Sequence, residues 1–126
     1  MAGVSQGEHF ERVREFALRM EGAREEFTFE FGIPVYKAAN GKIFAVVAPQ
    51  GDAVRVSLKL TPEEVLEALT LPFVRSAPYF SKTHWVMAEV TDEAELEMTL
   101  AWVRRSHELV TARPVRTSRR QRAPGP

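Results

Sequence analysis

The stretch from residue 27 to residue 60 constrains the fold more than any other part of the chain. Residues 27–31 alternate apolar and polar side chains, and so do residues 54–60, which is the period of a β-strand with one buried face. Asn40-Gly41 separates two apolar runs and tolerates positive φ at both turn positions, which is typical of a tight hairpin. We therefore expect an antiparallel meander of four strands, at residues 27–31, 35–38, 43–47 and 54–60.

Helix signals flank this meander. Ser5 and Glu8 form the pattern of a capping box, and Gly22 is placed to end the helix that follows. Thr61-Pro62-Glu63-Glu64 repeats the capping pattern with proline at the first helical position, and Pro72 ends this second helix. The spacing predicts helices at both places.

A fifth strand and a third helix complete the predicted elements. A loop from Pro72 to Thr83 is expected after the second helix. Residues 84–90 favour a strand with Trp85 and Met87, or also Ala88, turned inward. Thr91 or Asp92 is placed to cap a helix that continues to about residue 110. The order is therefore α-β-β-β-β-α-β-α. It predicts an α+β fold, with an antiparallel sheet of a four-strand meander plus a fifth strand and with three helices.

Charge is distributed unevenly along the chain. Five of the 17 basic residues, all arginine, lie in residues 111–126, which hold no acid, so the remaining 12 face 17 acids in residues 1–110. We expect residues 1–110 to form a single domain with a formal charge of about −5 and residues 111–126 to be a disordered basic tail. The tail is either a solvated extension or a contact for nucleic acid or an acidic surface.

The chain has no cysteine, which excludes disulfides and thiolate chemistry and fits a reducing cytoplasm. We find neither a signal-peptide pattern nor an apolar run long enough to span a membrane, so we expect a cytoplasmic protein without a membrane partner.

The sequence offers little support for catalysis. His9, His84 and His107 lack metal-ligand spacing, and no nucleophile elbow or phosphate-binding glycine loop is present. We therefore expect no cofactor, no metal and no catalytic residue. His84 stands apart, because Lys82 and Trp85 crowd it; it is either structural or part of a site.

Basic side chains near aromatic ones form the better candidate site. Arg55 and Lys59 project from one face of their strand, and Lys82 and His84 extend the group if the fifth strand pairs alongside. Such a pattern suits phosphate or a nucleic-acid strand, although lysine and arginine also fill the outward face of ordinary sheets. The candidate anion-binding residues are Lys37, Arg55, Lys59, Lys82 and His84, and the candidate surface aromatics are Tyr36, Tyr79 and Trp85.

Several short motifs together resemble those of the MmcQ/YjbR-like family of small bacterial proteins. They are Pro34-Val35-Tyr36-Lys37, Gly41-Lys42-Ile43-Phe44-Ala45, Ser57-Leu58-Lys59, and Pro78-Tyr79 with Lys82 and His84-Trp85; the similarity covers about residues 8–110. The resemblance implies a compact α+β fold likened to frataxin and secretion chaperones. The family is often described as DNA-binding, from the shape of its fold, and supplies no catalytic residue to carry over.

These observations favour a non-enzymatic binding module whose partner is nucleic acid. The alternative is a protein-interaction or chaperone-like module, or a self-associating one, that uses the same sheet face and its phenylalanines. A small-molecule-binding protein or enzyme is the third possibility.

Overall fold

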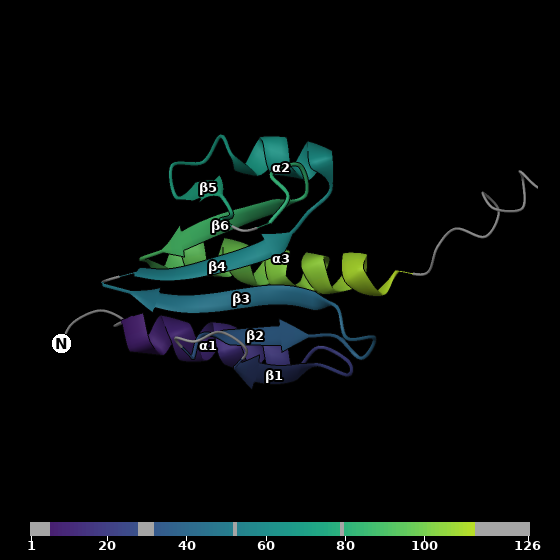
Figure 1. The fold of residues 1–126 in the computed structure, drawn as a ribbon. Coiled ribbons are helices and arrows are strands. Elements are labelled where there is room, and N and C mark those ends of the chain that lie inside the picture. The colour runs from purple at the N-terminus through teal and green to yellow at the C-terminus, as the bar shows by residue number, and fades with distance from the viewer. Residues whose placement is uncertain (1–5, 28–31, 52, 79, 113–126) are drawn as a thin grey trace, which may run out of the picture.

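The computed structural model describes residues 6–27, 32–51, 53–78 and 80–112, and within them it forms a six-stranded antiparallel sheet and three helices (Figure 1). The elements are α1 (Gln6–Leu18), β1 (Arg24–Phe27), β2 (Pro34–Lys37), β3 (Ile43–Gln50), β4 (Ala53–Lys59), α2 (Pro62–Ala68), β5 (Val74–Ser76), β6 (Trp85–Val90) and α3 (Glu93–Thr111). The strand order is β1-β2-β3-β4-β6-β5. The predicted α+β class and its antiparallel sheet are confirmed.

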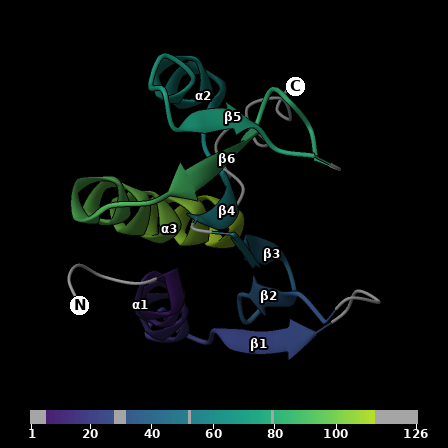
Figure 2. The same ribbon diagram turned by 90° about the vertical axis from the view of Figure 1, so that its left-hand side faces the viewer.

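The long helices α1 and α3 lie side by side on one face of the sheet, and the short α2 lies at the β5 end (Figures 1 and 2). The core lies between the sheet and these two helices, where Val56, Leu58 and Ala88 of the sheet and Leu96 and Val103 of α3 are fully buried. Neither α1 nor α3 covers the opposite sheet face, which we call the open face.

The helix starts follow the chemistry read from the sequence. Thr61 accepts a hydrogen bond from the Glu64 backbone N–H, and the Glu64 side chain accepts one from the Thr61 N–H, so the predicted capping box is formed. Of the two candidates for the cap of α3, Asp92 accepts from the Glu95 N–H. These bonds satisfy backbone donors that a helix start leaves without partners.

A serine hydroxyl joins the helix layer to the sheet. Ser106 of α3 is buried; its hydroxyl donates to the Phe44 carbonyl at 2.7 Å and accepts from the Lys59 N–H at 2.9 Å. The β3–β4 ladder pairs Ala45 with Leu58 and does not continue beyond them, so the hydroxyl occupies the position where the next strand-to-strand contact would form. Helix α3 therefore holds the end of β4 that carries Lys59.

Strand β5 is the main departure from the predicted order. Residues Pro72–Thr83 are expected to form a loop, but Val74–Ser76 pair with β6 as an edge strand. A three-residue strand has too little sequence for a periodic pattern, and its pairing comes from contact with β6.

The first strand also differs from its prediction. Strand β1 ends at Phe27, whereas the predicted strand begins there and continues through residues 28–31, which lie outside the described residues. Cross-strand pairing decides the position, since Arg24 lies opposite Lys37 and Phe27 opposite Pro34. The Phe27 side chain is 61% exposed.

Trp85 does not point into the core, which corrects the prediction for this residue of β6, whereas Met87 and Ala88 are buried as predicted. Val86, Ala88 and Val90 are fully buried toward the helices. Alternation puts Trp85 and Met87 on the open face, where Met87 is nevertheless buried at 7% exposure. Both faces of this strand are apolar in sequence, so the pattern alone cannot tell which one meets the helices.

Ser5 and most of the predicted tail, residues 113–126, lie outside the described residues. The helices that the structure describes are all too short or too polar to span a membrane.

Candidate functional site

The open face carries a line of paired residues across β4 and β6. Lys59 lies opposite Trp85, Ser57 opposite Met87 and Arg55 opposite Glu89. Side chains two residues apart on a strand share a face, so Arg55 and Lys59 project from the same side, as the sequence predicts.

Two aromatic rings stack at the Lys59 end of this line. The Phe80 and Trp85 rings lie 4.1 Å apart between centroids with an interplanar angle of 16°, and both side chains are only partly buried. A flat, half-exposed aromatic pair beside a lysine offers both a stacking face and a cation. We call Lys59, Phe80, Lys82, His84 and Trp85 the basic aromatic patch.

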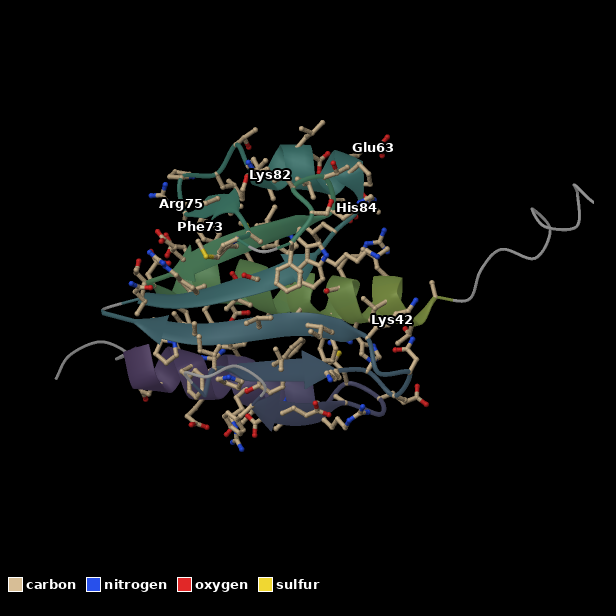
Figure 3. The ribbon with its side chains drawn as sticks, in the orientation of Figure 1. Lys42, Glu63, Phe73, Arg75, Lys82 and His84 are labelled. Atoms are coloured by element: carbon tan, nitrogen blue, oxygen red, sulfur yellow. The ribbon has the colours of Figure 1, made fainter. Side chains whose placement is uncertain are left out.

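A tight turn brings the loop residues of the patch to the sheet. The Ser81 carbonyl accepts hydrogen bonds from the backbone N–H groups of His84 and Trp85, at 3.3 and 3.0 Å. The His84 carbonyl accepts from the Leu60 N–H at 2.9 Å, which ties the turn to the residue after Lys59. Lys82 and His84 therefore enter at the same end of β4 and β6 as Lys59, and Figure 3 shows both near α2.

Ion pairs separate the five candidate cations into two groups. Lys37 Nζ lies 2.9 Å from Glu26 Oε1, and an Arg55 terminal nitrogen lies 2.8 Å from Glu89 Oε2. Glu89 also pairs with Arg75, at 3.4 Å. Lys37 and Arg55 are thus each paired with an acid of a neighbouring strand, which the sequence did not indicate.

The other three candidate residues have no acidic partner of this kind. Lys59, Lys82 and His84 form no ion pair or side-chain hydrogen bond with another residue of the described ranges. Lys82 is exposed, and Lys59 and His84 are partly exposed. Among the five candidate residues, those without an ion pair are therefore the three that belong to the patch.

Tyr36 is not a surface aromatic, which corrects its predicted role. Its side chain is fully buried, and its hydroxyl donates to Glu25 Oε2 at 2.7 Å, while Arg14 Nε donates to the same oxygen at 2.8 Å. Burial above all, and then the bond to Glu25, raise the pKa of Tyr36. Tyr79 lies outside the described residues.

Phe80 is the residue of the patch that the sequence did not predict to lie there. The sequence shows an aromatic in a proline-rich loop, which is equally compatible with a core residue. The structure adds the contact with Trp85, which depends on how the loop folds over the open face. Across the described residues, no group of three histidine, aspartate or glutamate side chains is placed to hold a metal ion.

A family model identifies the chain. The YjbR model matches residues 18–109, nearly three quarters of the sequence. This chain belongs to the YjbR family. The match includes all the described elements that carry the patch and leaves out most of α1 and the arginine-rich tail.

Solved structures agree with this assignment at the level of fold. A Deinococcus radiodurans protein with a DUF419 domain superposes with a TM-score of 0.72 at 23% identity, covering 89% of this chain and 85% of its own. A Pseudomonas syringae protein superposes with a TM-score of 0.67 at 18% identity, covering 79% of this chain and 96% of its own. A comparison with curated proteins gave no match.

The YjbR domain also has a cleft away from the patch's aromatic pair, between α2 and α3. It has a volume of about 280 Å³ and is lined by Glu64, Glu67, Ala68, Leu71, Trp102 and Arg105. Arg105 Nε contacts both carboxylate oxygens of Glu64 at 3.1 Å. Burial opposes ionisation of Glu64 most strongly, but hydrogen bonds from Thr61 and Arg105 prevail and lower its pKa.

Proposed function

We propose that this YjbR protein is a non-enzymatic binding module that holds a single-stranded nucleic acid against its basic aromatic patch. The observation that carries the proposal is the Phe80–Trp85 stack beside Lys59, on a sheet face that α1 and α3 leave uncovered. Single-strand-binding surfaces combine aromatic faces, on which bases stack, with cations that follow the phosphates.

Charge supports a strand in preference to a duplex. Residues 1–110 have a formal charge of about −5, which opposes the broad phosphate contact that duplex binding requires. The patch supplies only two lysines and a histidine, grouped around one aromatic pair. That arrangement suits a few nucleotides with unstacked bases.

The test is fluorescence anisotropy of a labelled oligothymidylate of roughly ten nucleotides, a length within the usual site sizes. We expect binding at low salt that weakens as salt rises, with a slope of about 0.7 per phosphate contact. Trp85→Leu should weaken binding about tenfold, since stacking of one base contributes about 1–3 kcal/mol. Lys59→Gln and Lys82→Gln should each lower the salt slope.

Lys42→Gln is the matched control. Lys42 is exposed and has no ion pair with another described residue, and it lies near the β2–β3 turn, just before the strand next to β4 (Figure 3). It therefore tests a cation at the same end of the sheet that is not part of the patch. Equal weakening by Lys42→Gln would contradict a localised site, and so would loss of all binding on deletion of residues 113–126. Absence of binding at low salt in the full-length and tail-deleted proteins would refute the proposal altogether.

The protein-interaction alternative has less support from the described surface. The exposed large apolar side chains among the described residues are Phe27, Leu66, Leu69 and Met98. Only Phe27 belongs to the sheet, at the edge strand β1, and the others lie on or directly after helices. Apolar surface is thus not gathered on the face that this alternative would use.

A further inference from the structure

The cleft between α2 and α3 has an acidic side chain that the fold does not use. Arg105 is held by Glu64, and its other end contacts Glu108 at 3.3 Å. The Glu67 carboxylate forms no hydrogen bond or ion pair with any other described residue. Glu63, on the same helix, is exposed and likewise lacks a described partner. The cleft and its rim therefore carry excess negative charge.

An indole forms another side of this cleft. Trp102 is partly buried, and one face of its ring stacks against Phe73 at 6.0 Å between centroids. Leu71 and Ala68 complete an apolar floor. A carboxylate beside an indole and a short apolar surface suits a guanidinium group, whose plane stacks on aromatic rings while its N–H groups donate to the acid.

The chain carries such groups in the residues that follow α3 in sequence. Residues 113–126 lie outside the described part of the structure and contain five arginines, no lysine and no acid. This charge of about +5 complements the formal charge of about −5 on residues 1–110.

The distances allow the tail to reach back. Trp102 lies nine residues before the end of α3 at Thr111, which is about 14 Å along the helix. Ala112 is already extended, with φ −63° and ψ 136°. At about 3.3–3.6 Å per extended residue, five residues cover that distance, so Arg116 and every later arginine can reach the cleft.

We propose that the arginine-rich tail, residues 113–126, docks on its own domain by placing an arginine in the α2–α3 cleft between Glu67 and Trp102. Tethering makes weak contacts sufficient, because a short linker holds the tail at an effective concentration of about a millimolar. The interaction is electrostatic at an exposed site, so salt screens it.

A spin label provides a direct test, since a chain without cysteine accepts one label at a chosen position. A nitroxide on Gln121→Cys of the full-length protein should broaden the amide signals of residues 64–71 and the Trp102 indole signal at low salt. The broadening should disappear at about 1 M salt, where the screening length is near 3 Å. Broadening confined to the end of α3, at either salt concentration, would overturn the proposal.

Two matched variants locate the contact. Glu67→Gln should reduce the docking constant about two- to fivefold, as expected for loss of one exposed ion pair. Glu15→Gln removes an exposed acid of α1 that has no partner among the described residues, and it should change nothing. An equal effect of both variants would mean that only net charge matters and would refute a specific cleft.

A mixed sample identifies the occupant. An isotope-labelled protein without a spin label is mixed with an unlabelled, spin-labelled copy at low concentration. Docking within one chain predicts no broadening in this sample. Broadening of residues 64–71 there would show that the tail of a second copy occupies the cleft, which would overturn the intramolecular proposal.

Discussion

At the scale of single residues, partners decide what a side chain contributes. Lys37 and Lys59 look alike in sequence, but Glu26 forms an ion pair with the first and no described acid pairs with the second. Tyr36 shows the same dependence, because its hydroxyl and Arg14 share one carboxylate oxygen of Glu25. That three-residue network connects α1, β1 and β2 at the β1 end of the sheet.

The Glu25 carboxylate should make stability depend on acid pH. The hydrogen bond from Arg14, chiefly, lowers the pKa of Glu25 below its usual 4.5, so its stabilising effect is complete above pH 4.5 and is lost as pH falls below it. Glu25→Gln should lower the free energy of unfolding at pH 7 by about 1.5–3 kcal/mol, the range for hydrogen bonds to charged groups. Urea unfolding of both proteins at pH 7 and pH 3 measures the difference in their free energies of unfolding.

At pH 3 the wild-type protein and Glu25→Gln should approach each other in stability. Tyr36→Phe is the companion variant, since it removes the neutral donor and keeps the Arg14 pair, and it should cost about 1 kcal/mol at pH 7. A constant gap between wild type and Glu25→Gln across this pH range would show that the network does not carry the acid dependence.

At the scale of elements, turns fix where helices and strands meet. Gly22 follows α1 with φ +71°, and a Cβ at this position would lie 2.7 Å from the Ala39 Cβ. Gly41 of the hairpin has φ +86° with open space around it. The two glycines therefore share a backbone requirement and differ in packing.

Gly22→Ala should destabilise the protein more than Gly41→Ala. Left-handed backbone costs a non-glycine residue about 1–2 kcal/mol at either position. Only Gly22→Ala also places a Cβ too close to its neighbour, so its free energy of unfolding should fall by about 1–3 kcal/mol more than that of Gly41→Ala, the usual cost of overpacking. Thermal unfolding compares the two variants, and equal losses would mean that the chain near Ala39 adjusts without cost.

Local chemistry explains which elements could be predicted. The capping residues Thr61 and Asp92 and the Asn40-Gly41 turn act within a few residues, so the sequence displays them directly. Strand β5 and the position of β1 depend on pairing with distant strands. The same limit applies to the site. Alternation along β4 is enough to predict that Arg55 and Lys59 share a face. The ion pair of Arg55 with Glu89 depends on the register of β4 and β6, and the stacking of Phe80 on Trp85 depends on the path of the loop before β6.

At the scale of the whole molecule, two layers hold the open face in place. Most contacts between them are apolar, but Ser106 adds a polar link by bonding β3 and β4 at once. The patch residue Lys59 is attached through its backbone to a helix on the other side of the sheet. The stability of the layered fold and the position of the patch are therefore connected.

Ser106→Ala tests this link. It leaves the Phe44 carbonyl and the Lys59 N–H without their partner, at about 1–3 kcal/mol each when buried. We expect a total loss of about 2–5 kcal/mol in denaturant unfolding, together with weaker oligonucleotide binding. Thr99→Val is the control, because among the described residues the buried Thr99 hydroxyl bonds only within its own helix, to the Glu95 carbonyl. A loss no greater than that of Thr99→Val would show that water or the two strands replace the serine.

The same serine separates two kinds of opening motion. In an ordinary ladder, an amide exchanges its hydrogen with solvent when the neighbouring strand separates. The Lys59 amide is held by α3 instead, so its exchange rate reports detachment of the helix layer, while the amides of the β3–β4 ladder report fraying of the sheet. One backbone hydrogen thus records whether the helices and the sheet open together or as independent units.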